Sequence, residues 1–276
     1  MAQIGKYNTL PVVSKADFGV YLDAGPLDTV LLPKRQVPEG CEVGDEISVF
    51  IYHDSEDRLI ATTAKAKAQV NECACLEVKD VTKFGAFLDW GLDKDLLVPS
   101  NQMRKPMEVG ERHVVYLYLD DFTDRVAATA KLSNFLREET TNYQKNDRVS
   151  LMVVNRTNIG YKVIIDQLYL GVIFNDDVLK PLKPGQKLMG YIKNVRSDNK
   201  LDVQMQLQGH EARVDIGDRI LQRLAEHDGC LLLSDKSSPD DIYAHFQVSK
   251  GNFKKAIGRL YKQKQIIIEP DRILLP

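Results

Sequence analysis

Aromatic residues recur in pairs in the first half of this 276-residue sequence, and each pair brackets a glycine. Phe18 and Tyr21 form the first pair, and Phe84 and Phe87 form the second. Exposed aromatic rings stack on unpaired nucleobases, and each such contact is worth roughly 1 to 3 kcal/mol. Side chains three apart on a strand face opposite sides, but the glycine permits a local twist that brings both rings to one surface. The pairs predict a base-stacking surface, and the alternative is that one or both rings of each pair belong to a core.

Positively charged residues stand where a nucleic-acid backbone would need them. Arg58 and Arg125 follow the two aromatic pairs at matching positions, and an arginine on a strand can hold a phosphate. Lys83 directly precedes Phe84, and Lys131 follows Arg125. A further group lies near the C-terminus and consists of Lys250, Lys254, Lys255, Arg259 and Lys262. This group predicts salt-sensitive phosphate binding, with a solvated helix face as the alternative.

The aromatic pairs belong to an internal repeat, which constrains the whole fold. Residues 18–33 (FGVYLDAGPLDTVLLP) and 84–99 (FGAFLDWGLDKDLLVP) are identical at seven of sixteen positions, at a constant offset of 66. Residues 57–62 return as residues 124–129 at an offset of 67. A weaker copy follows, in which residues 159–161 (IGY) take the place of the Phe-Gly start 75 residues after the second copy. The chain therefore contains two clear copies of one unit and a divergent third.

Each unit is predicted to be a small β-barrel. About five short apolar or alternating runs, separated by Gly, Pro and Asp clusters, fit into each unit. A glycine inside the second run suits a tight barrel corner, and the five-stranded OB-fold is the commonest barrel of this size. Residues 1–66, 67–140 and 141–212 are expected to form three tandem OB-fold barrels, with a helix and linker over residues 133–146. Trp90 is expected to add a stacking platform or to cover its barrel core.

The last unit, residues 213–276, follows helical periodicity instead. Residues 218–227 (DRILQRLAEH) predict a first helix, which the Asp-Gly pair at Gly229 ends. Further on, Pro239 is directly preceded by a serine and followed by two acidic residues. Because serine caps helices and proline is favoured at their first position, a second helix is predicted from Pro239 to about Phe246.

A third helix and a hairpin complete this unit. Ser249 is predicted to cap a helix over residues 250–263, whose apolar residues fall on one face. Apolar runs at residues 266–268 and 273–275 predict a strand, a turn and a strand. Three helices with a tight turn between the second and third, followed by a hairpin, are the order of a winged helix-turn-helix. The predicted fold class is therefore mainly β with a C-terminal α+β unit.

Net charge changes sign in the middle of the chain. The whole chain carries 37 Lys+Arg and 39 Asp+Glu, and its net charge of −2 gives no reason to expect a polyanionic partner. The first two units carry −4 and −3, whereas the third and fourth carry +3 and +2. This asymmetry directs an anionic partner toward residues 141–276.

The sequence has no recognisable motif for catalysis, metal binding or membrane insertion. No run approaches the roughly 18 to 20 apolar residues of a membrane span, and the first residues lack the order of a secretory signal. The four cysteines have no metal-ligand spacing and are expected to be free thiols, and the five histidines stand singly. We expect a cytoplasmic protein with no catalytic residues, no metal, no cofactor and no membrane partner.

The second copy resembles a known RNA-binding repeat. Residues 83–88 (KFGAFL), with Leu96-Leu97-Val98, Val109-Gly110-Glu111 and Asp124-Arg125, resemble the S1 ("S-one") domain, named after the largest ribosomal protein of the small subunit. The resemblance implies an OB-fold that binds single-stranded RNA through two strand aromatics, a histidine and a basic residue.

The copies match that binding set only in part. The matching residues are Phe84, Phe87 and Arg125 in the second copy and Phe18, Tyr21 and Arg58 in the first. The histidine after the third strand is missing, because Pro33, Pro99 and Phe174 stand at that position in the three copies. The third copy also has Ile159 and Lys162 in place of the aromatic pair, so its binding would depend on its positive charge.

Three such barrels followed by a winged helix resemble the conserved virulence factor B family of bacterial RNA-binding regulators, over essentially the full chain. The resemblance implies a cytosolic, non-enzymatic protein that influences gene expression after transcription. The leading hypothesis is a sequence-tolerant binder of single-stranded RNA. Two alternatives stay open: a duplex-DNA-binding transcription regulator that acts through the winged helix, and an adaptor whose acidic barrels dock on ribosome or RNA-degradation partners.

Overall fold

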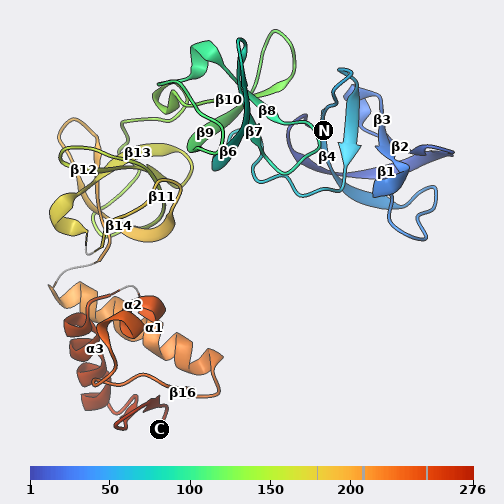
Figure 1. The fold of residues 1–276 in the computed structure, drawn as a ribbon. Coiled ribbons are helices and arrows are strands. Elements are labelled where there is room, and N and C mark those ends of the chain that lie inside the picture. The colour runs from blue at the N-terminus through green and yellow to red at the C-terminus, as the bar shows by residue number, and fades with distance from the viewer. Residues whose placement is uncertain (179, 207–208, 247) are drawn as a thin grey trace.

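The structure, a computed structural model, describes residues 1–178, 180–206, 209–246 and 248–276, and for residues 209–215 the backbone alone. Three barrels follow one another along an arc, and a unit of helices lies beside the third barrel (Figure 1). This arrangement confirms the predicted fold class of three five-stranded barrels followed by a winged helix.

The first barrel is closed by its strands in the order β1-β2-β3-β5-β4. These strands are β1 (Tyr7–Ala16), β2 (Gly19–Asp23), β3 (Thr29–Pro33), β4 (Glu46–His53) and β5 (Leu59–Thr62). Strands β3 and β5 pair in parallel and close the barrel, while the other neighbours are antiparallel. A five-stranded closed barrel of this length is the OB-fold that the run spacing predicts.

The second and third barrels repeat this order. The second contains β6 (Cys73–Thr82), β7 (Gly85–Asp89), β8 (Leu96–Pro99), β9 (Arg112–Leu119) and β10 (Val126–Thr129), as a sheet in the order β10-β9-β6-β7-β8. The third is closed and contains β11 (Arg148–Arg156), β12 (Gly160–Ile165), β13 (Tyr169–Phe174), β14 (Lys187–Val195) and β15 (Leu201–Gln204). The shared order shows that the divergent third copy is a barrel of the same kind.

A glycine begins the second strand of every barrel, at the point where the third strand lies against it. These glycines are Gly19, Gly85 and Gly160. A Cβ atom at any of them would stand well under 3.0 Å from a backbone carbonyl oxygen of the third strand. The oxygens concerned belong to Leu32, Val98 and Ile173. Because no other residue type lacks a Cβ, the close approach of the two strands requires glycine here.

The C-terminal unit has the order of a winged helix. Its elements are α1 (Gly209–Glu226), β16 (Cys230–Leu231), α2 (Pro239–Phe246), α3 (Lys250–Lys262), β17 (Ile267–Ile268) and β18 (Ile273–Leu274). Helix α2 has the bounds that its capping residues predict, and the hydroxyl of Ser249 accepts a hydrogen bond from the amide of Asn252 at the start of α3. The apolar face of α3 is buried in the core of this unit, through Phe253, Ile257 and Leu260.

Two predictions about the connecting segments are wrong. In the described part of residues 133–146 the structure has no α-helix, only a single 3-10 turn at Leu132–Asn134. The chain beyond this turn joins the third barrel instead, through a bridge between Arg137 and Tyr169. Helix α1 begins at Gly209 rather than at Asp218, so it crosses the predicted boundary at 212. The unit boundaries themselves stay predictions.

The first two barrels are joined by a seam of aromatic side chains. Trp90 of the second barrel is buried, and its ring lies 5.6 and 6.1 Å from the rings of Phe50 and Tyr52 of the first barrel, measured between centroids. Its Nε1 donates a hydrogen bond of 2.5 Å to the carbonyl of Lys94. Trp90 is therefore not a stacking platform; it joins the core of the second barrel to the first.

A second seam joins the second and third barrels. Its buried residues are Cys73, Val114, Tyr116, Leu132, Leu136, Met152, Ile164 and Leu170. Phe135, from the connecting segment, stacks on Tyr116 and Tyr118 with centroid distances of 4.8 and 5.0 Å. Burial raises the pKa of the Cys73 thiol to about 12, so this thiol is neutral and acts as an apolar packing group.

The third barrel meets the winged helix through polar contacts. Lys180 pairs with Asp240 at 2.5 Å, and its Nζ lies 4.9 Å from the ring centroid of Tyr243 in α2. Asn252 of α3 donates to the side chain of Gln206 at 3.2 Å. Exposed ion pairs of this kind contribute at most about 1 kcal/mol each, so the ion pair between the described residues of this junction stabilises it only weakly.

The close approach at Gly85 gives a first prediction. The substitution Gly85→Ala forces the backbone of Val98 to move, and overpacking of this kind costs about 1 to 3 kcal/mol. We expect a lower midpoint of thermal unfolding, measured by circular dichroism. Gly258→Ala is the matched control, because its Cβ meets nothing within 4 Å and alanine favours a helix interior. Equal midpoints for both variants would contradict the steric account.

Candidate nucleic-acid interface

The aromatic pairs lie at the surface of the first two barrels. The side chains of Phe18 and Phe84 are 57% and 66% exposed at equivalent positions, and Tyr21 and Phe87 are half-buried. The rings of Phe18 and Tyr21 meet edge to face, with centroids 6.2 Å apart. The ammonium group of Lys83 lies 5.0 Å from the ring centroid of Phe84. Neither pair belongs to a barrel core, and one ring of each pair has a largely free surface.

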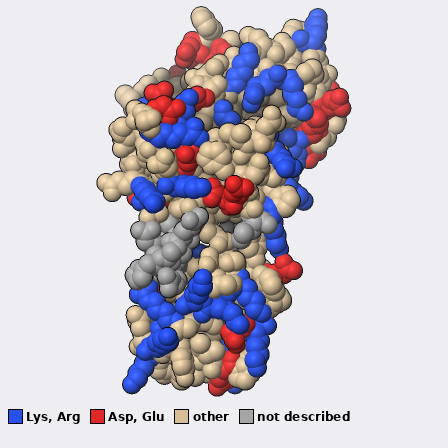
Figure 2. All heavy atoms as spheres, turned by 90° about the vertical axis from the view of Figure 1, so that its left-hand side faces the viewer, with Lys and Arg blue, Asp and Glu red and all other residues tan. Residues whose placement is uncertain are grey.

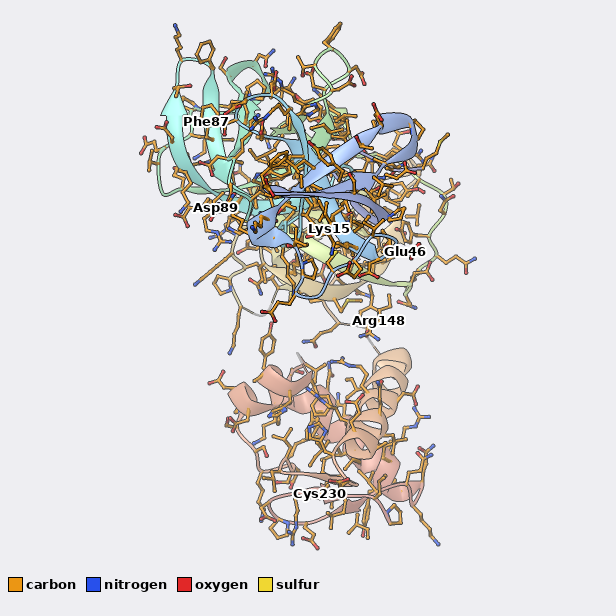
Figure 3. The ribbon with its side chains drawn as sticks, turned by 90° about the vertical axis from the view of Figure 1, so that its right-hand side faces the viewer. Lys15, Glu46, Phe87, Asp89, Arg148 and Cys230 are labelled. Atoms are coloured by element: carbon orange, nitrogen blue, oxygen red, sulfur yellow. The ribbon has the colours of Figure 1, made fainter. Side chains whose placement is uncertain are left out.

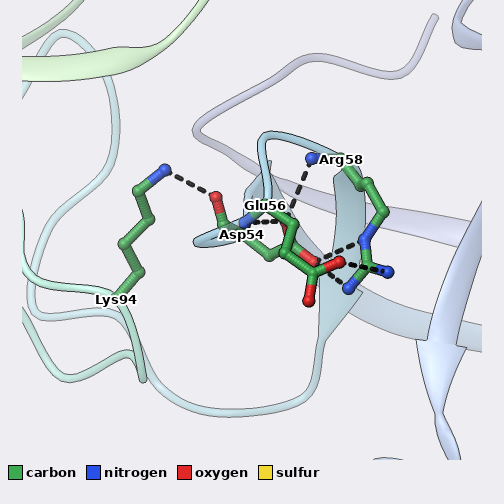
Figure 4. Close-up of polar contacts among 4 residues, drawn as sticks. All are labelled: Asp54, Glu56, Arg58 and Lys94. Carbon is green, nitrogen blue, oxygen red and sulfur yellow. Dashed lines mark hydrogen bonds and ion pairs between the residues drawn. The ribbon is translucent and has the colours of Figure 1, made fainter.

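Arg58 is held by carboxylates of its own turn (Figure 4). Its Nε and Nη2 donate to Asp54 at 3.0 and 2.7 Å, and its Nη1 lies 2.8 Å from Glu56. Lys94 of the second barrel donates to the backbone carbonyl of Asp54 at 2.6 Å. Burial raises the pKa of Asp54, but the hydrogen bonds from the amide and side chain of Arg58 outweigh it and leave the pKa below its ordinary value.

The other predicted basic residues of these barrels also lie near the first seam or the end of a strand. Arg125 of the second barrel pairs with Asp57 of the first, and Arg35 of the first pairs with Asp93 of the second. Lys131 is half-buried just after β10. Both arginines that match the S1 pattern are thus paired with carboxylates beside the seam.

The strand register separates Arg58 from the exposed ring. Arg58 directly precedes β5, which runs parallel to β3 with Ile60 level with Leu31. Leu31 in turn pairs with Tyr21 of β2. Arg58 therefore lies level with the C-terminal end of β2, whereas Phe18 precedes its N-terminal end. The structure does not bring these two predicted site residues together.

The third barrel carries a groove of about 410 Å³ on the corresponding face. Here Lys162 of β12 takes the place of Tyr21, and Ile159, at the position of Phe18, is 56% exposed. Glu138 lies 3.7 Å from Lys162 at the edge of the groove. The basic and apolar side chains of the lining include Ile159, Lys162, Leu170, Val172, Arg196 and Lys200. The groove combines apolar surface for a base with positive charge for a phosphate.

An aromatic ring lies beside this groove at the position where the S1 pattern has a histidine. The ring centroid of Phe174 lies 5.8 Å from Nζ of Lys193 and 5.7 Å from the guanidinium of Arg196. Arg196 also pairs with the largely buried Asp202 at 2.6 Å, which fixes its position. The third barrel therefore has a ring and two cations in one place, although it lacks the aromatic pair.

The basic residues of the winged helix differ in exposure. Those exposed on α3 are Lys254, Lys255 and Lys262. Lys254 lies 3.5 Å from Asp235, and Lys250 is half-buried and donates to the carbonyl of Lys236. Arg259 has a buried Nη1 without a hydrogen-bond partner in the described part of the chain. Three of the five predicted residues thus present their charge to solvent on the helix that enters a groove in such motifs.

The predicted residues occupy several surfaces rather than one site. Figure 3 shows Phe87 of the second barrel at one end of the molecule and Cys230 of the winged helix at the other. Lys and Arg gather on the winged helix and on the barrel above it (Figure 2). A single nucleic-acid strand could therefore contact both the stacking residues and helix α3 only if it extended along the molecule.

Comparison with known proteins identifies the family. Residues 4–64 and 72–131 match the S1 domain, and residues 218–275 match the CvfB-like winged helix domain. Uncharacterized protein YitL of Bacillus subtilis (strain 168) is 30% identical over 96% of this chain and 91% of its own length. Conserved virulence factor B of Staphylococcus aureus (strain N315) is 30% identical over 85% of this chain and 80% of its own length. The chain belongs to the conserved virulence factor B family.

One solved structure aligns with nearly the whole length of this chain. It is a multidomain protein with nucleic acid binding domains from Streptococcus pneumoniae, 25% identical over 99% of this chain and 98% of that chain, with a TM-score of 0.42. Both matched domain types, the S1 domain and the winged helix, are nucleic-acid-binding folds, which supports nucleic acid as a partner. No helix in the described part of the chain is long and apolar enough to cross a membrane.

The groove of the third barrel was not predicted from the sequence. Arg196 and Lys200 come from the loop between β14 and β15, and Phe174 ends β13, so three separate segments build the site together with β12. Two signals were present in the sequence. The third unit is the most basic of the four, and Phe174 stands at the position of the missing histidine.

The turn at Asp54 gives a prediction about pH. The substitution Asp54→Asn weakens the hydrogen bonds to Arg58 and Glu56, so we expect the free energy of unfolding at pH 7 to fall by about 1 to 3 kcal/mol. Because folding lowers the pKa of Asp54, this stability is present above the ordinary value of 3.8 and is lost as the pH falls through the folded value.

Urea unfolding of the wild type and the D54N variant at pH 7 and at about pH 3 measures this effect. The difference between the two proteins should shrink at the lower pH. Asp17→Asn is the control, because Asp17 is exposed and makes no ion pair in the described part of the chain. A difference of the same size at both pH values would show that the carboxylate charge is not the cause.

Proposed function

We propose that this protein binds single-stranded RNA and acts as a non-enzymatic, cytoplasmic regulator of bacterial gene expression after transcription. The observation that carries the proposal is the exposed ring that recurs at Phe18 and Phe84 on two barrels. Bases inside a duplex already stack on their neighbours, so a free protein ring favours unpaired bases. The chain also belongs to a family that contains S1 domains, and this supports RNA as the nucleic acid that supplies the unpaired bases.

Two surfaces supply the positive charge for phosphates. Lys162, Arg196 and Lys200 line the groove of the third barrel, and the exposed lysines of α3 lie on the winged helix. Cations at phosphates release counterions, which provides affinity without sequence preference. In this arrangement the first two barrels contribute base stacking and the C-terminal half contributes phosphate binding. The binding is then tolerant of sequence, because stacking and phosphate contacts both act on every nucleotide.

The stacking role predicts the effect of removing both rings. The double substitution Phe18→Ala and Phe84→Ala should weaken binding to an unstructured oligoribonucleotide by about tenfold or more, because each stacked base contributes roughly 1 to 3 kcal/mol. Fluorescence polarisation with a labelled oligonucleotide measures the affinity. The double substitution Val43→Ala and Val109→Ala is the matched control, since these apolar side chains are 57% and 65% exposed at equivalent positions between the third and fourth strands of the same barrels. Unchanged affinity in the variant that lacks both rings would refute stacking on these barrels.

The phosphate role predicts a change in salt dependence. The double substitution Lys254→Ala and Lys255→Ala should lower the slope of log affinity against log salt by about 0.7 for each phosphate contact that is lost. The groove variants Lys162→Ala and Lys200→Ala should act in the same direction. Lys15→Ala with Lys79→Ala removes two lysines from the acidic barrels and serves as the control. If the control lowers the slope as much as the α3 variant, the charge effect is not local.

Competition between single-stranded RNA and duplex DNA separates the proposal from its alternatives. Single-stranded RNA should compete at lower concentration than duplex DNA at every salt concentration. Tight, sequence-dependent binding to duplex DNA that survives loss of both rings would instead favour a transcription regulator. Binding to neither nucleic acid would favour a protein-interaction adaptor.

A further inference from the structure

A second hollow, of about 520 Å³, lies between the second and third barrels. The second barrel contributes Arg104 and Lys105 from the segment between β8 and β9, and Arg112 from β9. The third barrel contributes Asn155 of β11 and Pro184. The hollow has the size of known small-molecule sites, which run from about 300 to 1,000 Å³. It shares no lining residue with the groove on the strand face of the third barrel.

The lining of this hollow is positively charged, although the second unit as a whole is acidic. Arg104 and Arg112 have no carboxylate within ion-pair distance in the described part of the chain, and Arg112 donates to the backbone carbonyl of Cys75 at 3.2 Å. The one acid of the lining, Glu111, lies 3.5 Å from Lys105 and 2.7 Å from Nε2 of His113. Glu77 lies opposite Arg112 in the β6–β9 register but forms its ion pair with Lys79, so among the described residues both arginines keep their charge for an anion.

Asn155, a residue of the lining, has an unsatisfied acceptor. The Oδ1 atom of Asn155 is buried and receives no hydrogen bond from the described residues, while its Nδ2 donates to the carbonyl of Arg156 at 2.9 Å. A buried carbonyl oxygen without a donor is unfavourable, so a ligand that supplies an N–H or O–H group gains by binding here. Apolar side chains of Met107, Val114 and Val154 complete the wall.

The packing of the seam holds the walls of the hollow in place. Val114 belongs to the buried cluster that joins the two barrels, and it also lines the hollow. The turn at Pro184 packs so closely that a Cβ on Gly185 would stand under 3.0 Å from Cys75 of the second barrel. A site between two tightly packed barrels is formed before the ligand arrives, which lowers the cost of binding.

We infer that this hollow binds a nucleoside monophosphate. The phosphate lies against Arg104 and Arg112, the base packs on the apolar wall, and an amino or hydroxyl group of the nucleoside donates to Oδ1 of Asn155. The nucleotide has two sources of the same chemistry: a free nucleotide, or the phosphorylated end of an RNA strand. The inference goes beyond the proposed function, because the exposed rings and the α3 lysines lie outside this hollow.

Calorimetric titration of the full chain with AMP, GMP, CMP and UMP tests the free nucleotide. A short oligoribonucleotide with and without a 5′-phosphate tests the strand end. Arg104→Glu should weaken the binding by about tenfold or more, because it replaces a charged hydrogen bond with repulsion. Arg148→Glu makes the same charge change at the opposite end of β11 from Asn155 and should leave the binding unchanged. Asn155→Ala should weaken the binding of the nucleoside monophosphates without weakening the binding of inorganic phosphate.

Two results support the inference. One is saturable binding of a mononucleotide that the R104E variant loses, and the other is a preference for the 5′-phosphate that the same variant loses. The inference is overturned if the wild type shows neither, or if the R104E and R148E variants bind alike. Thermal unfolding checks that each variant is folded, and Arg104→Ala replaces the charge reversal if the latter unfolds. Affinity for an oligoribonucleotide without a 5′-phosphate, measured by polarisation in the same samples, keeps the two proposals apart, because it depends on the exposed rings and lysines and not on this hollow.

Discussion

The architecture depends on one steric constraint, the close approach of two backbone strands at the start of the second strand in each barrel. At Gly19, Gly85 and Gly160 a carbonyl oxygen of the third strand occupies the space that a Cβ would need. The residue just before each glycine lies in the tight connection between the first and second strands of its barrel, outside the sheet. The side chains at those preceding positions, two phenylalanines and an isoleucine, are exposed. A requirement of the fold thus creates the exposed position that the proposed function uses.

The seams between barrels determine which charges remain available. Trp90 draws the first two barrels together, and this brings Arg125 next to Asp57. At this seam Arg125 and Arg35 are paired with Asp57 and Asp93, so neither arginine is free to bind a phosphate. In the groove of the third barrel Arg196 is likewise paired with Asp202, whereas Lys162 and Lys200 have only long contacts of 3.7 and 3.8 Å with acids. The first seam explains why Arg125, which matches the S1 pattern, is not free for a phosphate.

Local signals made much of the fold predictable from the sequence, whereas contacts between distant segments were not. The residues around Pro239 determine the start of α2 by capping alone, and the exposed rings follow from one residue type that recurs at a repeated corner. The segment after Leu132 is not helical because Arg137 pairs with the third barrel, which its polar composition does not indicate. Arg58 has the expected position in the sequence, but the register places it at the other end of β2 from Phe18. Residue type and spacing therefore predicted exposure better than they predicted proximity.

The division of charge along the chain has a physical consequence for the proposed function. Two acidic units repel a polyanion at long range, whereas stacking acts only at contact, and screening limits the repulsion to about 10 Å at 0.1 M salt. In the proposed function an RNA strand therefore meets the basic third barrel and winged helix first. Once it is held there, its free end is confined near the first two barrels, and the second contact is made at a high effective concentration. Stacking on Phe18 and Phe84 then needs no net positive charge nearby, because the C-terminal half already supplies the attraction.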